Sequence, residues 1–455
     1  MNSEPISAAL PSKKTGAPTS APTPHWLFHY RRENLPGDIL AGAVVAVMLV
    51  PQGIAYAMLA GLPPQVGLYV SIIPPLLYGL LGSSPVLAVG PMAIVSLVVG
   101  QRIGELVAHL GVPAPPLAQT LAAMVGVILI VLGIFRLGFL VDAINQPVLV
   151  GFTDASVLVI ALAQLKYLLD VPVPLQHSAY QTLIATLRDV PQTNPVTLGL
   201  GLSSIGVLLF FKFRLGELLR KAGAPARLAA LLPRAGALAA IIFSTVTVWA
   251  LHLDTHADVS VVGDVPSGLP PLTVPSLEPS RWADLFPTAL VLAFVSYMIS
   301  ISVAKTFANR GRGRIDANRE LWALGTANLG AAFTGGYPVA GGFGRSSVNM
   351  ASGANTGLAS VITAGLMTLT VVFLTPFFYH MPKAVLAAVV LVAVSTLFDT
   401  QTPPHLWHTC RADAMTLGVT FVAVLGLGIE SGIVVGVLFS LPVALWHKSR
   451  ACRRA

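Results

Sequence analysis

One arginine, Arg345, lies in a glycine-rich stretch, GGYPVAGGFGRSSVN over residues 335–349, between apolar segments. A charged side chain at bilayer depth is costly, and it usually faces a cavity, a partner or a substrate path. Glycines let the backbone approach a ligand closely, and they allow a helix to begin with its free N–H groups directed at that ligand. The pattern predicts an anion site made by Arg345 and a helix start.

A second short segment, LAVGPMAIVS over residues 87–96, resembles the GGFGRSSVN run of residues 341–349. Each has a Gly or Gly-Pro break followed by a helical start, which is typical of inverted-repeat proteins with a site at the membrane midplane. Each helix N-terminus supplies unpaired N–H donors and about half a positive charge. We expect two half-helices to meet at the midplane, where Arg345 completes the anion site without a metal.

The composition predicts a membrane protein. The 455 residues are 55% hydrophobic and 10% charged, with a mean hydropathy of +0.77, unlike a soluble domain of this size. Many apolar runs reach the roughly 20 residues that span a bilayer as helix, without the alternation of an outer-membrane barrel. We therefore expect an all-α polytopic membrane protein without a cofactor. Cys410 and Cys452 support neither a disulfide framework nor a metal site.

Fourteen membrane segments are expected, seven in each half, so that the halves are inverted relative to one another. The segments lie near 38–60, 64–82, 88–100, 117–137, 145–168, 194–211, 233–251, 287–305, 319–333, 343–352, 355–379, 382–398, 412–428 and 430–447. Two of them, near 88–100 and 343–352, are too short to cross alone. The expected organisation is a tail (1–35), a first repeat (36–252), an extracytoplasmic loop (253–286), a second repeat (287–447) and a tail (448–455).

The basic residues indicate the orientation. They gather before the first span and after the last, at Lys13, Lys14, Arg31, Arg32, Lys448, Arg450, Arg453 and Arg454. The positive-inside rule then places both termini in the cytoplasm, together with the segment 212–234 and the loop 310–314. We expect a multi-pass protein of a bacterial-type inner membrane. The net charge of +8 reflects this orientation rather than nucleic-acid binding. The first 24 residues resemble a disordered tail rather than a signal peptide.

Five motifs together carry a family resemblance. They are VPQGIAY (50–56), GLPPQVGLY (61–69), AVGP (88–91), NREL (318–321) and GGFGRSSVN (341–349). In this order they resemble the sulfate permease (SulP) family, the bacterial relatives of the solute carrier 26 anion transporters, over nearly all of residues 36–447. The resemblance implies two inverted seven-segment repeats, divided into a core and a gate domain. The substrate would lie between the third and tenth helices and move with the core in an elevator-like step.

The resemblance also implies the site residues. The family's anion pocket falls on Gln52, Tyr56, Met92, Ala93, Phe343, Gly344, Arg345 and Ser346. Gln52 and Ser346 can donate hydrogen bonds, while Tyr56 and Phe343 can present positive ring edges to an anion and exclude water. Family substrates include sulfate, bicarbonate, chloride and dicarboxylates. Members commonly form homodimers, so a homodimer is expected here through membrane faces.

This sequence departs from the family pattern in three places. Ile299 precedes the run SISVAK (300–305), where many relatives have a glutamate linked to cation or proton coupling. Gly344 replaces the usual serine before the pocket arginine. Only residues 447–455 follow the last helix, where the family normally carries a cytoplasmic STAS domain. We therefore expect either a member without that domain or a truncated chain.

The missing glutamate makes Asp154, in the fifth span, the candidate for carrying a coupled proton. The alternative is that Asp154 lies near a helix end, where it caps the helix or pairs with Arg136. Glu430 is expected to be a turn residue between the last two spans. Arg102 and Glu105 are expected after the third helix, as an exposed or loosely paired set.

The favoured function is secondary active transport of a small anion such as sulfate, bicarbonate or a dicarboxylate like fumarate. An anion channel or uncoupled exchanger on the same fold is the alternative, which Ile299 favours. A nucleobase transporter would be expected to have carboxylates on the eighth and tenth helices. Ile299 and the run 343–346 provide none there, which disfavours this class. A non-transporting membrane scaffold is the remaining class. A nucleotide-binding enzyme is disfavoured because no strand precedes the glycines of 341–344 and no Lys-Ser/Thr follows them.

Overall fold

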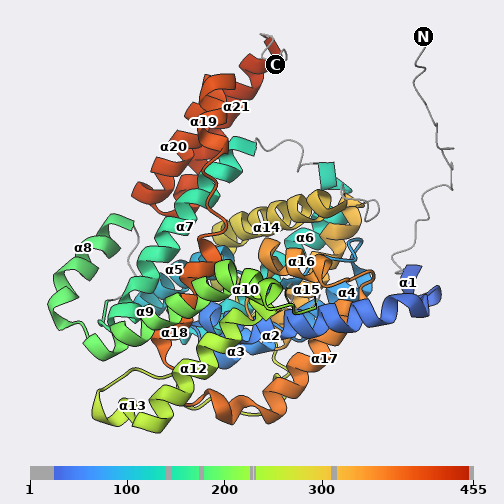
Figure 1. Cartoon of the computed structure of the whole chain (residues 1–455). Helices are drawn as coiled ribbons and strands as arrows, with labels where there is room; N and C mark the ends of the chain where they lie inside the picture. Colours follow the sequence, from blue (N-terminus) through green and yellow to red (C-terminus); the bar gives the residue numbers. More distant parts are fainter. Residues whose placement is uncertain are drawn as a thin grey trace, which may run out of the picture.

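The computed structural model describes residues 25–139, 146–173, 179–225, 229, 232–308 and 315–449. Several residues on which the predicted orientation and the cysteine argument depend lie outside the described residues. They are Lys13, Lys14, Arg310, Arg312, Arg314, Arg450, Cys452, Arg453 and Arg454. The described residues are mostly helical (Figure 1).

Within these described ranges, eight helical stretches are long and apolar enough to cross a membrane. They are Arg32–Leu59, Pro64–Leu81, Ala93–Leu110, Ala114–Ile134, Gln146–Leu169, Pro195–Lys221, Leu232–Leu251 and Pro279–Ala308. Shorter apolar helices cover Leu358–Phe373, Lys383–Val394 and Ile429–Ser440. The prediction of a largely helical, multi-pass membrane protein is confirmed.

One group of helices packs around small residues. It comprises α2 (Leu35–Leu59), α3 (Pro64–Tyr69), α4 (Ile73–Leu81), α6 (Ala114–Ile134), α14 (Pro279–Ala308), α15 (Ala317–Phe333) and α17 (Leu358–Phe373). Helix α15 packs on α6 and α4, and α17 packs on α2 and α4. A methyl group on Gly126 would lie 2.9 Å from the carbonyl oxygen of Gly325, so glycine lets α6 and α15 approach closely.

A second group comprises α7 (Gln146–Leu169), α9 (Pro195–Phe210), α12 (Gly236–Leu251), α18 (Lys383–Val394), α20 (Arg411–Leu427) and α21 (Ile429–Ser449). Figure 1 shows α20 and α21, in red, beside the teal α7, and α20 packs on both. Helix α18 packs on α7 and α9, and it also contacts α2 of the first group. The end of α18 therefore lies where the two groups meet.

Two short strands interrupt the helical fold at the predicted glycine breaks. β1 (Val89–Gly90) and β2 (Ala340–Gly341) pair antiparallel, with Val89 opposite Gly341 and Gly90 opposite Ala340. The expectation of helices alone missed this pair, and a strand does precede the 341–344 glycines. Pairing satisfies backbone N–H and C=O groups that would each cost several kcal/mol if left bare in a bilayer.

Each strand leads into one of the two predicted half-helices, which are α5 (Ala93–Leu110) and α16 (Phe343–Ala351). The prediction for α16 agrees with the structure, whereas the expected end of the third segment near residue 100 was wrong. Helix α5 continues to Leu110 and stops at Gly111, whose φ of 65° suits glycine. At 18 residues, α5 is long enough to cross.

Other boundaries also differ from the expected ones. The span 64–82 is divided into two helices, α3 and α4. The helix of the span 382–398 ends early, at Val394, and α14 begins at Pro279 rather than near residue 287. The span 194–211 runs on through a π turn (Phe211–Leu215) into α10 (Gly216–Lys221). Four short helices were not predicted, namely α1 (His25–Phe28), α8 (Ala179–Asp189), α13 (Leu253–His256) and α19 (Thr402–Thr409).

Candidate functional site

The starts of α5 and α16 lie beside the β1–β2 pair. The residues that precede these helices, Met92 and Gly342, have extended backbones and provide no side-chain hydrogen bond to the first turn. The first N–H groups of a helix have no intrahelical partner, and they carry the positive end of the helix dipole. Both helix starts can therefore attract an anion.

The Arg345 guanidinium is buried between these two helix starts. The residue is 4% exposed, and its Nη1 donates a hydrogen bond to Gln52 Oε1 at 3.3 Å. A methyl group on Gly342 would lie 3.0 Å from Arg345 Cζ, and one on Gly90 would lie 3.7 Å from Nη2. The guanidinium thus lies against the backbone of both strand segments, and the contact is tight at Gly342 and ordinary at Gly90.

Two nitrogens of this guanidinium are unsatisfied. Arg345 Nε and Nη2 are buried and have no hydrogen-bond partner among the residues that the structure describes. A buried charge that lacks partners is strongly unfavourable, because nothing replaces the hydration it has lost. The planar N–H fork of arginine matches oxyanions such as sulfate or carboxylate. The geometry therefore provides positive charge and free donors for an anion.

A small cavity of about 50 Å³ lies in front of these groups. It is lined by seven of the eight residues named from the sequence, which are Gln52, Tyr56, Met92, Ala93, Phe343, Gly344 and Arg345. Gly342 and the end of α18 complete it through Ala393, Thr396 and Leu397. Sequence reasoning missed these last three residues because no motif marks them and their position depends on how α18 packs.

Ser346 has a different place from the one expected. Its hydroxyl donates to the Gly342 carbonyl at 2.7 Å and accepts from the Ala88 N–H at 2.9 Å. A serine hydroxyl has one proton, so none is left for a bound anion. Ser346 is fully buried and joins the segment before β1 to the start of α16.

Polar side chains of the neighbouring helices hold the strand segments in place. Ser300 Oγ, on α14, accepts from the Gly341 N–H at 2.8 Å. Asn328, on α15, accepts from the Val339 N–H at 2.9 Å and donates to the carbonyl of the same residue at 3.2 Å. Asn349 donates to the Val86 carbonyl at 3.0 Å. The sequence analysis did not single these residues out, although polar side chains inside apolar segments are a signal that could have indicated a supported backbone break.

Asp154 lies eight residues into α7 rather than at a helix end. It is 3% exposed, and its Oδ1 accepts the Asp399 N–H at 2.9 Å, so Asp399 rather than Arg136 is its hydrogen-bond partner. Asp154 and Ile299 line the same larger cavity of about 500 Å³. This cavity shares Phe343, Thr396 and Leu397 with the anion cavity, which makes the two cavities neighbours.

Three other charged residues lie within helices, where they were not expected, although the expected pairing of Arg102 with Glu105 is present. Arg102 and Glu105 lie within α5 and form an ion pair at 3.0 Å. Glu430 lies in the first turn of α21, where it accepts a hydrogen bond from Thr288 Oγ1 at 2.8 Å. Since Thr288 belongs to α14, this bond connects the two groups of helices.

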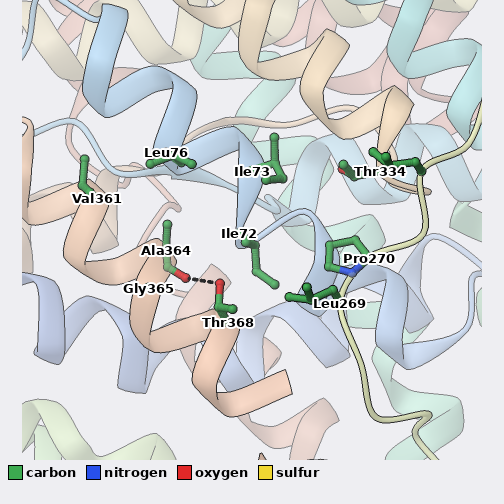
Figure 2. A pocket seen from close by; sticks show the side chains of 11 residues that line it. Ile72, Ile73, Leu76, Leu269, Pro270, Thr334, Val361, Ala364, Gly365 and Thr368 are labelled. Atoms are coloured by element: carbon green, nitrogen blue, oxygen red, sulfur yellow. Dashed lines mark hydrogen bonds between the residues drawn. The ribbon is translucent and has the colours of Figure 1, made fainter. Parts of the chain in front are cut away.

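A larger apolar cavity of about 470 Å³ offers none of these features. Figure 2 shows Ile72, Ile73 and Leu76 on one side, Leu269 and Pro270 on another, and Val361, Ala364 and Thr368 of α17 on a third. No charged side chain lines it. An anion would lose its hydration there without compensation, so the cavity beside Arg345 is the candidate site.

The fold is that of a polytopic membrane protein with a buried arginine beside the starts of two helices, each of which follows a short strand. Residues 35–420 match the sulfate permease family, and the chain belongs to that family of membrane anion transporters. The family consists of transporters rather than enzymes.

Known proteins agree with this assignment. The chain is 36% identical to the chloroplastic sulfate transporter 4.1 of Arabidopsis thaliana, over 95% of this chain and 61% of the relative. It spans less than two thirds of that relative. The solved structure of SLC26A9 has a TM-score of 0.86 at 26% identity, over 93% of this chain and 67% of that one. The transmembrane domain of a cyanobacterium bicarbonate transporter, BicA, shares the fold, with a TM-score of 0.72 at 22% identity over 90% of this chain and 98% of that one.

Proposed function

We propose that this protein is a secondary active transporter of a small inorganic anion, which binds in the cavity beside Arg345. The observation that carries this proposal is the buried guanidinium, whose Nε and Nη2 have no partner at the meeting point of two uncapped helix starts. The family assignment supports anion transport, and the names of the relatives point to sulfate or bicarbonate.

The size of the cavity favours a compact ion. At about 50 Å³ it is far smaller than the roughly 300–1,000 Å³ of ordinary ligand pockets. Sulfate, bicarbonate and chloride suit this volume better than an extended dicarboxylate such as fumarate. Gly344 leaves the cavity without the family's usual serine hydroxyl, so the backbone N–H groups and Arg345 are the principal donors.

The proposed mechanism is elevator-type alternating access. The group that contains α2, α14, α15 and α17 corresponds to the core domain, and the group that contains α7, α18, α20 and α21 corresponds to the gate. The cavity lies between core residues and the end of α18, so a relative movement of the two groups would open it. The antiparallel β1–β2 pair joins equivalent segments of the 36–252 and 287–447 halves, which supports inverted repeats of seven segments each.

Proton coupling is assigned to Asp154. Its carboxylate lies in the cavity next to the anion cavity, and protonation would remove a negative charge from the path of the anion. An uncoupled exchanger or an anion channel is the second candidate, because Ile299 lines the same cavity where many relatives have a glutamate. Current that scales with driving force without saturation would favour the channel.

The proposal also covers the membrane location, topology and partners of the protein. We expect a bacterial-type inner membrane, fourteen segments and both termini in the cytoplasm, because the basic residues favour that side. A homodimer through membrane faces is expected from the family. Lipid, a small anion and a proton are then the partners.

An uptake panel in proteoliposomes tests the function. Sulfate, bicarbonate, chloride and fumarate are compared, with and without an inward-directed proton gradient. Saturable uptake of a small inorganic anion, increased by the gradient and exceeding fumarate uptake, is expected. Uptake of no anion above that of empty liposomes would contradict the proposal.

A further inference from the structure

A polar cavity of about 490 Å³ lies at the end of the helix bundle where α2 begins, away from the anion site. Four separate segments line it: the residues before α2, the end of α4 with the turn that follows, the start of α15, and the segment before α17. Its charged or titratable lining residues are His29, Arg31, Glu33 and Arg319.

Neither arginine of this cavity forms an ion pair with a described residue. Arg319 Nε donates to the Leu81 carbonyl at 2.8 Å. The nearby buried acids are already occupied. Glu320 accepts hydrogen bonds from Tyr78 and Ser83, and Asp38 accepts them from Tyr30, Asn355 and Thr356. Glu33 is then the one acidic residue in the lining of this cavity, compared with two arginines, so the lining carries a net positive charge.

The wall formed by the residues before α2 is fixed in place. Trp26 Nε1 donates to the Gly79 carbonyl at 3.2 Å, and the Tyr30 hydroxyl donates to Asp38 Oδ2 at 3.2 Å. Burial and the neighbouring Asp38 carboxylate raise the pKa of Tyr30 to about 12, so its hydroxyl remains a donor at neutral pH. A methyl group on Gly357 would overlap the Gly79 carbonyl oxygen, which shows how closely α4 and the start of α17 approach.

Exposed apolar side chains flank the same end of α2. Leu27 is 48% exposed, Phe28 is 72% exposed, and Ile39 in the first turns of α2 is 48% exposed. In a membrane protein such residues face acyl chains, and tryptophan favours the interface between lipid and water. These exposed apolar residues indicate that the cavity opens at the level of lipid headgroups. Basic pockets between membrane helices at this depth bind phosphate headgroups.

We propose that this cavity binds the phosphate of an anionic phospholipid through Arg31 and Arg319. The arginine forks supply charge-assisted hydrogen bonds to phosphate oxygens, while Leu27, Phe28 and Ile39 contact the acyl chains. This site is separate from the proposed transport site. The bound lipid fastens the segment before α2 to α4 and α15.

Titration of purified protein with phosphatidylglycerol, followed by native mass spectrometry, tests this site. Arg31→Gln and Arg319→Gln are each expected to weaken phosphatidylglycerol binding about tenfold, the loss of one charge-assisted contact. Arg32→Gln is the matched control, because the adjacent Arg32 is exposed and does not line the cavity. It should change the affinity by less than about twofold. The Arg31 side chain makes no hydrogen bond to a described residue, and its carbonyl still accepts from the Asn34 N–H in the variant, so Arg31→Gln should fold normally.

Three results would overturn the assignment. An equal loss of affinity in the Arg31 and Arg32 variants would indicate general surface attraction. Binding of phosphatidylcholine as tight as that of phosphatidylglycerol would show that the cavity does not require an anionic headgroup. Displacement of the lipid by inorganic phosphate would instead assign the cavity to a soluble phosphate. The Arg345→Ala variant should still bind phosphatidylglycerol, which separates this test from that of the transport site.

Discussion

Arg345 and Gln52 are joined by a single hydrogen bond, from Nη1 to Oε1 at 3.3 Å, which connects α16 to α2. The glutamine amide is neutral, so it orients the guanidinium without cancelling its charge. The remaining charge is left for the cavity, where Nε and Nη2 have no partner. This relationship explains how an arginine can be oriented at the site and still attract an anion.

Replacing Gln52 with glutamate should inhibit anion binding. Gln52→Glu keeps the shape of the side chain but places a negative charge 3.3 Å from Arg345 Nη1. The resulting internal ion pair should weaken anion binding by about tenfold or more. Gln101→Glu, on α5 but outside the cavity lining, is the matched control. Concentration-dependent uptake measures the effect, and equal apparent affinities in the two variants would contradict the expectation.

Two glycines of the same turn should respond differently to substitution. A methyl group on Gly342 would lie 3.0 Å from Arg345 Cζ, whereas nothing lies within 4 Å of one on Gly344. Gly342→Ala should displace the guanidinium and reduce uptake severalfold. Gly344→Ser should be accommodated, and the added hydroxyl should change the preference among sulfate, bicarbonate and chloride. If Gly342→Ala transports like the unmodified protein, the close contact is not required.

Ser346 should matter for stability. Ser346→Ala leaves the buried Ala88 N–H without its acceptor, at a cost of about 1–3 kcal/mol. The neighbouring Ser347 is half-buried and has no such bond, so Ser347→Ala is the control. Thermal unfolding in detergent should show a lower midpoint for Ser346→Ala alone. Equal midpoints would indicate that the hydroxyl does not stabilise the strand segments.

Asp154 should determine the pH dependence of uptake. Asp154→Asn removes the titrating group but keeps an oxygen that can accept the Asp399 N–H. Uptake should then become independent of the proton gradient. Glu430→Gln, which also exchanges a carboxylate for an amide but outside both cavities, should keep the dependence. Persistence of the pH dependence in Asp154→Asn would exclude Asp154 as the coupling group.

Asp399, the hydrogen-bond partner of Asp154, is not expected to titrate near neutral pH. Burial alone would raise its pKa, but hydrogen bonds from Thr402 and Gln401 outweigh burial and hold the pKa of Asp399 below its ordinary value. The ionised form therefore stabilises the loop above the unfolded-state pKa of about 3.9, and this contribution is lost as the pH falls through the folded-state pKa. Near neutral pH, Asp399 remains charged, so changes in uptake there should come from Asp154.

The sequence predicted local features of this fold well and tertiary features less well. The glycine break placed the start of α16 at Phe343, because the break depends on residues next to one another. The β1–β2 pair was missed because strand pairing depends on contacts between distant segments rather than on two-residue propensities. Ser346 fits the motif, yet the Ala88 N–H that engages it is 258 residues away. Thr396 of the cavity had no sequence signal at all.

Binding of the transported anion by Arg345 is tested by saturable uptake of radiolabelled sulfate and bicarbonate into proteoliposomes that contain Arg345→Ala. Loss of the guanidinium contacts should cost roughly 3 kcal/mol of binding free energy, which weakens binding of the transported anion by about a hundredfold. The control is Arg188→Ala, an exposed arginine on α8, which should transport normally. Uptake by Arg345→Ala at the unmodified rate and affinity would show that the anion is not held by this arginine.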